Sequence, residues 1–181
     1  FSGIVSSVIS VLQYYSNESM LKAYIIWTMG NLSSVTMSQI KIMAILVAIG
    51  ILLSIISTKA LNAQILGETY ARSLGINIFY SRSIIFISTG IMTGAVTAFC
   101  GPIGFIGIAV PHIARLMYKT SDHKILIPSG IFIGSITMLI SDILSQLPAQ
   151  NIILPINSVT SIIGIPIVIY IIIKNKKFTM V

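Results

Sequence analysis

Long apolar runs separated by short charged segments dominate the pattern of this chain. A transmembrane helix needs about 20 mainly apolar residues, and a short one needs about 17. Windows without formal charge therefore locate candidate spans. We expect six, at residues 1–15, 41–58, 83–100, a short broken span at 105–118, 125–147 and 156–173.

Two segments at the start of the chain need a separate interpretation. Residues 1–15 carry no initiator Met and no basic region ahead of an apolar core, so they are not typical of a signal peptide. We interpret them as the tail of a membrane helix whose beginning precedes this sequence. Residues 23–40 are uncharged but too polar to face lipid, which predicts a short interfacial or re-entrant helix.

Composition favours a lipid environment. Hydrophobic residues make up 55% of the chain, charged residues only 8%, and the mean hydropathy is +0.99. A soluble domain carries roughly a quarter charged residues. The net charge of +7 comes from basic residues placed between apolar runs, not from a basic patch with interleaved aromatics, so we expect no nucleic-acid partner. Cys100, alone in an apolar run, is expected to be a small buried hydrophobe.

The distribution of Lys and Arg predicts the orientation in the membrane. With six crossings, three basic segments fall on one side and hold nine of the eleven Lys and Arg residues. These segments are 59–82, 115–124 and 174–181. We therefore expect a multi-pass protein of the plasma or inner membrane with a cytoplasmic C-terminus.

Helix breakers crowd the segment from Gly101 to Arg115. Non-helical chain survives at membrane depth only where protein buries it or where it lines a cavity. The segment thus predicts part of a translocation pathway. Its candidate residues are Gly101, Pro102, Gly104, Phe105, Gly107, Pro111 and His112.

Residues 62–75 form the longest element on the expected cytoplasmic side and are predicted to be one short helix. Glu68 and Arg72 stand at i,i+4 in the favourable order, and Gly75 is placed for a left-handed cap. Leu66, Tyr70 and Leu74 would share one face. Such a helix offers a docking surface for a partner; the alternative is a helix that lies on the membrane interface.

Asp142 is the only acid inside an expected span. Ionising a carboxyl group in hydrocarbon is costly, so such a residue is a functional candidate. Ser141, Ser145 and Gln146 could hydrogen-bond it, which leaves a helix-packing role open beside a pathway role. Two Gly-x-x-x-Gly pairs, at 90/94 and 130/134, favour close approach of helices.

Missing motifs also bound the chemistry. The sequence holds no Gly-x-x-x-x-Gly-Lys-Ser/Thr phosphate loop, so we expect no ATP hydrolysis by this chain and no bound cofactor. His112 and His123 stand eleven residues apart without a nearby thiolate, which is not the ligand spacing of a zinc site. We predict no metal site.

Several short motifs follow one another in a fixed order. They are LGETYARSLG at 66–75, GPIGFIG at 101–107, PHIARL at 111–116, Asp122-His123 with Pro128, Ser141-Asp142, Leu154-Pro155 and Gly164-Ile-Pro166. In this order and spacing they closely resemble the FecCD family, the permease subunits of cobalamin, haem and ferric-siderophore ABC importers. The resemblance covers essentially the whole chain and matches the C-terminal half of such a permease.

The resemblance implies an all-α, polytopic helix bundle of the cobalamin-permease type, partial, with about six of some ten transmembrane helices. Residues 1–181 would belong to one transmembrane domain, with 59–82 as its cytoplasmic coupling loop. It also implies a second permease subunit (homodimer or paired heterodimer), two ATPase subunits that bind ATP and Mg, and an extracytoplasmic binding protein. The implied ATPase-coupling residues are Leu66, Gly67, Glu68, Ala71, Arg72, Ser73, Leu74 and Gly75.

Three positions depart from the family pattern. Gln146 stands where the family usually has Arg, Ile153 where it has Glu, and Asn157 where it has Gly. A polar pairing on the outer side is therefore expected to be absent, which affects docking of the binding protein.

The function expected from the resemblance is import of an iron chelate (ferric siderophore or haem) or cobalamin. The alternative is a secondary transporter or channel for a small solute, which would also use broken helices but should show ion-coupling carboxylates. A membrane-embedded enzyme would need paired acids or a nucleophile and base, and none is visible. The scarcity of metal donors in the spans favours an intact chelate over a bare ion. Its passage would be lined by small residues such as Gly94, Ala95, Thr97, Ala98 and Ser135.

Overall fold

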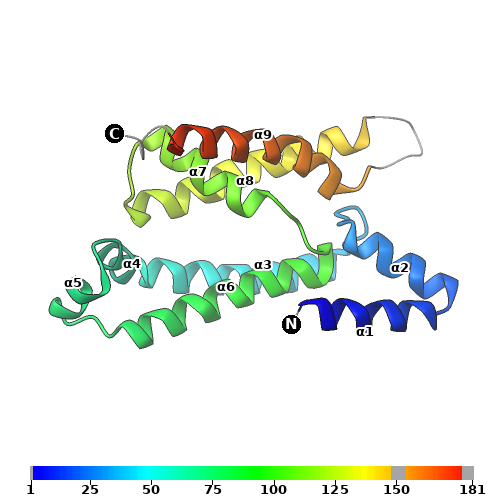
Figure 1. Ribbon diagram of the computed structural model, residues 1–181, viewed down its shortest axis with the longest axis horizontal. Coiled ribbons are helices and arrows are strands. Elements are labelled where there is room, and N and C mark those ends of the chain that lie inside the picture. Colours follow the sequence, from blue (N-terminus) through cyan, green and yellow to red (C-terminus); the bar gives the residue numbers. More distant parts are fainter. Residues whose placement is uncertain (1, 148–153, 177–181) are drawn as a thin grey trace.

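The computed structural model describes residues 2–147 and 154–176, and these residues form helices and connecting segments without a β-strand. Figure 1 shows their arrangement. The helices are α1 (Ser2–Tyr14), α2 (Glu18–Thr28), α3 (Met37–Ile56), α4 (Thr58–Ile65), α5 (Glu68–Ser73), α6 (Ile78–Cys100), α7 (Ile106–Tyr118), α8 (His123–Gln146) and α9 (Ile156–Lys176). The all-α prediction is confirmed for this part of the chain.

Each of the six expected spans corresponds to a helix, namely α1, α3, α6, α7, α8 and α9. Within the described ranges, α3, α6 and α8 are long and apolar enough to cross a membrane. The apolar helices α1, α7 and 156–170 of α9 are shorter. The number of crossings thus stays a prediction.

Three spans, α3, α6 and α8, begin earlier than their charge-free windows because polar residues cap them. Thr36 and Gln39 form a capping box, in which each side chain accepts a hydrogen bond from the backbone N–H of the other, so α3 begins at Met37 and not at residue 41. At α6, the Asn77 side chain accepts the Tyr80 N–H (3.1 Å) and starts the helix.

The expected helix at 23–40 is only partly present. Helix α2 ends at Thr28, and an irregular segment follows up to Thr36. The polar residues that suggested an interfacial helix serve instead as turn and cap residues. Gly30 has φ +75°, which a helix does not tolerate, and it ends the helical path here.

Helices α3 and α6 pack side by side along their length (Figure 1). Ser88 on α6 donates to the carbonyl of Gly50 on α3 (2.7 Å) and also pairs with Ser54 (2.7 Å). A Cβ on Gly50 would lie 2.3 Å from Met92 Cγ, so glycine permits this close approach. Of the glycines in the two Gly-x-x-x-Gly pairs, only Gly134 faces another helix: an added Cβ there would lie 3.8 Å from Val110 Cγ1 on α7, whereas one on Gly90, Gly94 or Gly130 would meet no described atom within 4 Å.

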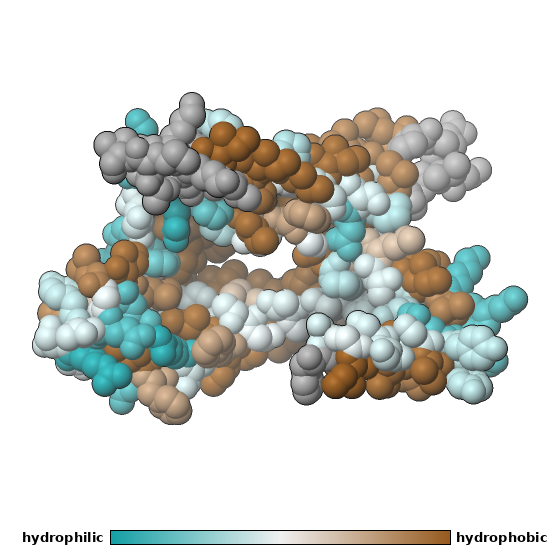
Figure 2. All heavy atoms as spheres, viewed as in Figure 1, coloured by the Kyte–Doolittle hydropathy of each residue, from teal (hydrophilic) through white to brown (hydrophobic). Residues whose placement is uncertain are grey.

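The helices form two groups. Helices α3 to α6 make one, and α7, α8 and α9 pack against one another to make the other, drawn in the lower and upper parts of Figure 1. Figure 2 shows hydrophobic side chains over much of the outer surface and a hollow between the two groups. A buried apolar cluster of Ala63, Ala71 and Ile78 holds α4, α5 and the start of α6 together.

The two groups place the expected basic segments together. The α4–α5 element, the turn between α7 and α8, and the end of α9 lie at the same end of the molecule (Figure 1). Helix α2 and the start of α9 lie toward the opposite end. This arrangement matches the separation that the Lys and Arg distribution predicts.

Candidate functional site

The expected coupling element is not one helix over 62–75; that prediction is wrong. Helix α4 ends at Ile65 and α5 begins at Glu68, with Gly67 at φ +107° between them. A side chain at this φ would be strained, so glycine breaks the helix here. The result is a pair of short helices joined by a tight turn at the end of α3 (Figure 1), which we call the α4–α5 corner.

Gly75 ends α5 as the sequence predicts. Its φ is +78°, its N–H donates to the Arg72 carbonyl (2.9 Å), and the Ile76 N–H donates to the Ala71 carbonyl (3.1 Å). These two hydrogen bonds define a Schellman motif, which satisfies the last carbonyl groups of the helix. Ile76 then packs against the cluster of Ala63, Ala71 and Ile78, so the cap also fixes the return of the chain into α6.

Polar side chains anchor the corner to α6. Glu68 does not pair with Arg72; its partner is Arg82. Gln64 donates to the Ser81 hydroxyl one residue earlier (2.9 Å). The expected i,i+4 pair is therefore wrong, because α6 brings the Arg82 guanidinium to Glu68. Arg72 and Ser73 stay exposed.

The outer face of the corner is apolar and open. Leu66, Tyr70 and Leu74 are 67%, 48% and 57% exposed, whereas Ala71 on the inner face is completely buried. The three side chains predicted to share one face, Leu66, Tyr70 and Leu74, are thus all exposed. Beside them, a shallow hollow of about 430 Å³ runs from Arg72 to Phe79.

The breaker-rich segment is non-helical from Gly101 to Phe105, and α7 begins at Ile106. Phe105 has φ +64° and ψ −38°, and the Ile106 N–H donates to the Gly104 carbonyl (2.8 Å). This is a γ-turn of the strained, positive-φ kind. Gly164 on α9 leaves room for Phe105, because a Cβ on this glycine would lie 2.6 Å from Phe105 Cβ.

The three glycines of this segment have different surroundings. A Cβ on Gly101, at φ +78°, would lie 2.0 Å from the carbonyl oxygen of Trp27. The same atom on Gly104 or Gly107 would meet nothing within 4 Å. Gly101 is therefore required for close contact with α2, whereas Gly104 and Gly107 face open space.

Three irregular segments meet around Gly101. The Asn31 N–H donates to the carbonyl of Cys100 (2.9 Å), and the Ile156 N–H donates to the carbonyl of Gly30 (3.4 Å). We call the union of segments 28–31, 101–105 and 154–157 the three-segment junction. It joins α2, the α6–α7 connection and the start of α9.

Asn157 connects all three segments through its side chain. Its Oδ1 accepts the Gly104 N–H (2.9 Å), and its Nδ2 donates to the carbonyls of Pro102 (2.7 Å) and Thr28 (3.2 Å). In the sequence, Asn157 stands out only as a departure from the family pattern. Its partners lie 53 to 129 residues away, so no local signal reveals its role.

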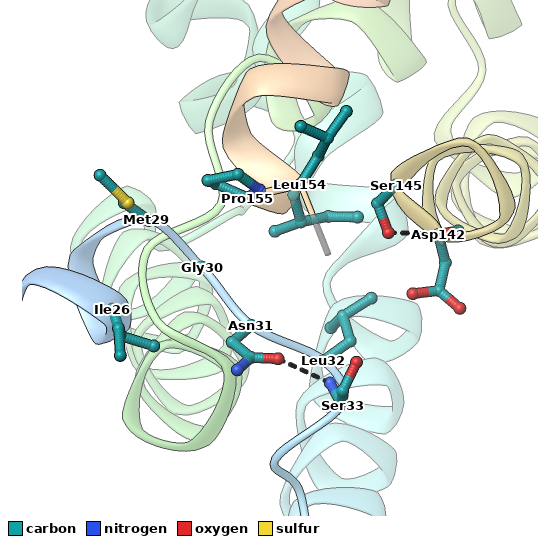
Figure 3. A pocket seen from close by; sticks show the side chains of 11 residues that line it. Ile26, Met29, Gly30, Asn31, Leu32, Ser33, Asp142, Ser145, Leu154 and Pro155 are labelled. Atoms are coloured by element: carbon teal, nitrogen blue, oxygen red, sulfur yellow. Dashed lines mark hydrogen bonds between the residues drawn. The ribbon is translucent and has the colours of Figure 1, made fainter. Parts of the chain in front are cut away.

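Asp142 lines a cavity of about 190 Å³ next to this junction (Figure 3). In Figure 3, Asp142 and Ser145 lie on one side, and the backbone of 30–33 lies across from them. Gln146 donates to the Asp142 carboxylate (2.9 Å), whereas Ser145 donates to the Asp142 backbone carbonyl (2.7 Å). Ser141 is fully buried without a described partner. Of the three expected partners, only Gln146 reaches the carboxylate.

The remaining pathway candidates are spread along α7. Pro111 lies inside this helix and is exposed, and His112 is half-buried beside it. Among the small residues expected to line a passage, Gly94, Ala98 and Ser135 are exposed, Thr97 is half-buried and Ala95 is buried. Ile153, the third departure from the family pattern, lies outside the described residues.

Comparison with known proteins identifies close relatives. The FecCD transport family matches residues 1–174. The vitamin B12 import system permease protein BtuC of Salmonella newport (strain SL254) is 35% identical over 174 residues, which cover 96% of this chain and 53% of that protein. The Citrobacter koseri BtuC is 33% identical, with 96% and 52% covered. The chain thus spans about half the length of the curated relatives it matches.

A solved structure shares the fold. It is an inward-facing conformation of an ABC transporter assigned to the metal-chelate type, 28% identical, with a TM-score of 0.84. The likeness covers 96% of this chain and 57% of that one. The arrangement of helices described above is therefore that of a membrane transport bundle.

Proposed function

The chain belongs to the FecCD transport family, and on this basis we propose that it forms part of the permease of an ABC importer. The cargo is an iron chelate (ferric siderophore or haem) or cobalamin. The named functions of its relatives, vitamin B12 import and metal-chelate transport, support this range of cargo. The permease pairs with a second permease subunit, two ATPase subunits and an extracytoplasmic binding protein.

The α4–α5 corner is the part of the chain that contacts the ATPase. The observation that carries this proposal is its exposed apolar face, Leu66, Tyr70 and Leu74, on a corner whose inner side packs through the buried cluster of Ala63, Ala71 and Ile78. A rigid projection with an open apolar face suits a cleft in a partner protein. ATP and Mg would be bound by that partner.

The end of the bundle that carries the corner faces the cytoplasm. The α4–α5 corner, the α7–α8 turn and the end of α9 lie together there (Figure 1). Segments 59–82, 115–124 and 174–181, which include these elements, hold nine of the eleven Lys and Arg residues. The C-terminus would accordingly be cytoplasmic. The three-segment junction and Asp142 would then lie toward the outer side.

Disrupting the cap of α5 should uncouple the permease from its ATPase. In the complete transporter, we expect Gly75→Val to lower both copurification of the ATPase and transport-stimulated ATP hydrolysis by about tenfold, because a β-branched residue at φ +78° is strained by about 1–3 kcal/mol. The amount of permease in the membrane should not change, since no atom lies within 4 Å of an added Cβ. Copurification and phosphate release measure the effect.

The matched control is Gly75→Asn, because Asn adopts the left-handed conformation more readily than other non-glycine residues. It should keep near-normal coupling. Equal copurification and ATPase stimulation in the Val variant and the wild type would remove the coupling role of this corner. A secondary transporter or channel, the alternative function, would need no ATPase at all.

The cargo should cross as an intact complex. A bare transition-metal ion gives up its hydration only where several donors replace it, and in the described part of the chain no three His, Cys, Asp or Glu residues are grouped for metal binding. The probes are cobalamin labelled on cobalt and on the corrin, and a chromium(III) siderophore complex labelled on metal and on ligand. Cobalt in cobalamin and chromium(III) in the siderophore complex leave their ligands very slowly. The metal label therefore reports the metal, and the ligand label reports the ligand, throughout the experiment.

We expect whichever probe proteoliposomes take up to deliver its two labels at equal molar amounts. Proteoliposomes without ATP serve as the control for leakage and surface binding. Entry of the metal label without the ligand label would refute transport of the intact complex.

A further inference from the structure

The two helix groups meet toward the two ends of the bundle. At one end, the three-segment junction joins them; at the other, α4 contacts the start of α8. Figure 2 shows the hollow that separates the groups between these ends. A movement of the α4–α5 corner therefore has a direct contact route to α8 at its own end.

Asn62 on α4 bridges this contact. Its Nδ2 donates to the Asp122 carboxylate (2.5 Å), and its Oδ1 accepts the backbone N–H of His123 (2.9 Å). His123 Nδ1 lies 2.7 Å from the same Oδ1. Because that amide oxygen can only accept, Nδ1 carries the proton and donates. A single amide thus makes three hydrogen bonds to the first residues of α8.

The receiving side of the bridge is itself fixed. Asp122 caps α8 by accepting the Lys124 N–H (2.9 Å), and its own N–H donates to the Thr120 hydroxyl (3.1 Å). The Lys124 N–H and the Asn62 amide hold the pKa of Asp122 below its usual value. The carboxylate is consequently ionised at neutral pH, and its hydrogen bond with the amide is charge-assisted.

Apolar packing at this contact is loose. An open cavity of about 300 Å³ lies between Ile55 and Thr58 on one side and Lys124, Ile127 and Pro128 on the other. By contrast, α3 and α6 pack side by side along their length. The polar bridge is therefore the most specific connection between α4 and α8.

We propose that Asn62 is a positioning residue that makes the α7–α8 turn move with the ATPase-coupling corner. This inference rests on the proposed function, because it assumes that an ATPase moves the corner. Asn62 would act through Asp122 and His123, and it would contact neither nucleotide nor cargo. A movement passes from one element to another when contacts make the two elements shift together. The three hydrogen bonds of the Asn62 side chain provide such a contact between α4 and the start of α8.

The test uses the complete permease assembled with its ATPase in nanodiscs. Spin labels at Ser34 and Ser121, both exposed, report the position of the α7–α8 turn relative to the opposite end of the bundle. The native Cys100 is buried and should not take up label. The distance is measured without nucleotide and after trapping with ATP and vanadate, and ATP hydrolysis is measured in parallel.

We expect the trapped wild type to show a shifted distance. Asn62→Asp places a carboxylate against Asp122, and Asn62→Ala removes the bridge without adding charge. Both variants should still hydrolyse ATP, but trapping with ATP and vanadate should no longer shift the label distance in either of them. An unaltered shift in Asn62→Ala would overturn the inference.

A reciprocal exchange separates bridging from general stability. The double variant combines Asn62→Asp with Asp122→Asn. The carboxylate, now at position 62, accepts hydrogen bonds from the backbone and ring N–H groups of His123. The amide, now at position 122, donates to that carboxylate, and its oxygen still accepts the Lys124 N–H. The shift should return. Failure of this double variant to recover it, with ATP hydrolysis intact, would also overturn the inference.

Ser83→Ala is the matched control for Asn62→Ala, because it also removes a side-chain hydrogen bond, and the described bond of the Ser83 hydroxyl, to the Phe79 carbonyl, stays within α6. It should behave as the wild type. A wild-type permease that recruits no ATPase would refute the proposed function itself. If trapping changes the label distance equally in the wild type and in Asn62→Ala, only the role of Asn62 is refuted.

Discussion

Gly101→Ala should prevent stable folding of the permease. The new Cβ would lie 2.0 Å from the Trp27 carbonyl oxygen and 3.3 Å from Gly30 Cα, both backbone atoms that no rotamer change can move. Alanine at φ +78° adds backbone strain. We expect a loss of about 3 kcal/mol or more in the free energy of unfolding. Thermal unfolding in detergent and the yield of folded protein measure it.

Gly104→Ala is the matched control, because its added Cβ meets no atom within 4 Å and its φ lies outside the left-handed region. We expect the unfolding midpoint of this variant to stay near that of the wild type. Similar midpoints for the two variants would mean that the backbone of α2 does not contact Gly101 as described. The pair distinguishes a glycine needed for folding from one that faces open space.

Charge-free windows predicted the positions of the helices well, because a lipid environment excludes charge from long segments whatever the tertiary contacts. Their boundaries were less predictable. Arg82 lies outside the predicted span, yet it belongs to α6, because Asn77 caps this helix five residues earlier. Likewise, Thr36 and Gln39 seemed too polar for a span but cap its first turn.

The coupling corner shows which local signals suffice. Gly75 was predicted correctly, because a Schellman cap is made by residues close in sequence. Gly67 sits in a similar setting, but its use as a break depends on how α4 and α5 fold back on α6. The partner of Glu68 could not be predicted from helix spacing, because Arg82 approaches from fourteen residues away.

Amide side chains that join distant segments gave no sequence signal of their role. Asn62 lies in a helix with partners about sixty residues away, and Asn157 has partners still farther. A helix pattern predicts which face such a residue occupies but not what faces it. The contacts that Asn62 and Asn157 make, each at its own end of the bundle, therefore required the structure.

Replacing Asn157 should loosen the three-segment junction. Asn157→Gly restores the residue that the family usually carries and removes three side-chain hydrogen bonds, each contributing about 0.5–1.5 kcal/mol. Asn157→Asp keeps an acceptor for the Gly104 N–H but points a carboxylate at the Pro102 and Thr28 carbonyls. We expect both variants to be destabilised, and the Asp variant more, because its charge faces two carbonyl oxygens.

Hydrogen–deuterium exchange measures the effect where it arises. The Gly104 amide should exchange about tenfold faster in the Gly variant, since the bond to Asn157 Oδ1 is lost. The α7–α8 turn should keep its exchange rate. Ser161→Ala, one turn along α9, is the control, because its hydroxyl donates only to the Asn157 backbone carbonyl (2.5 Å) within the same helix. Unchanged exchange at Gly104 in the Gly variant would show that backbone contacts alone hold the junction, and the family's usual glycine would then serve this fold equally well.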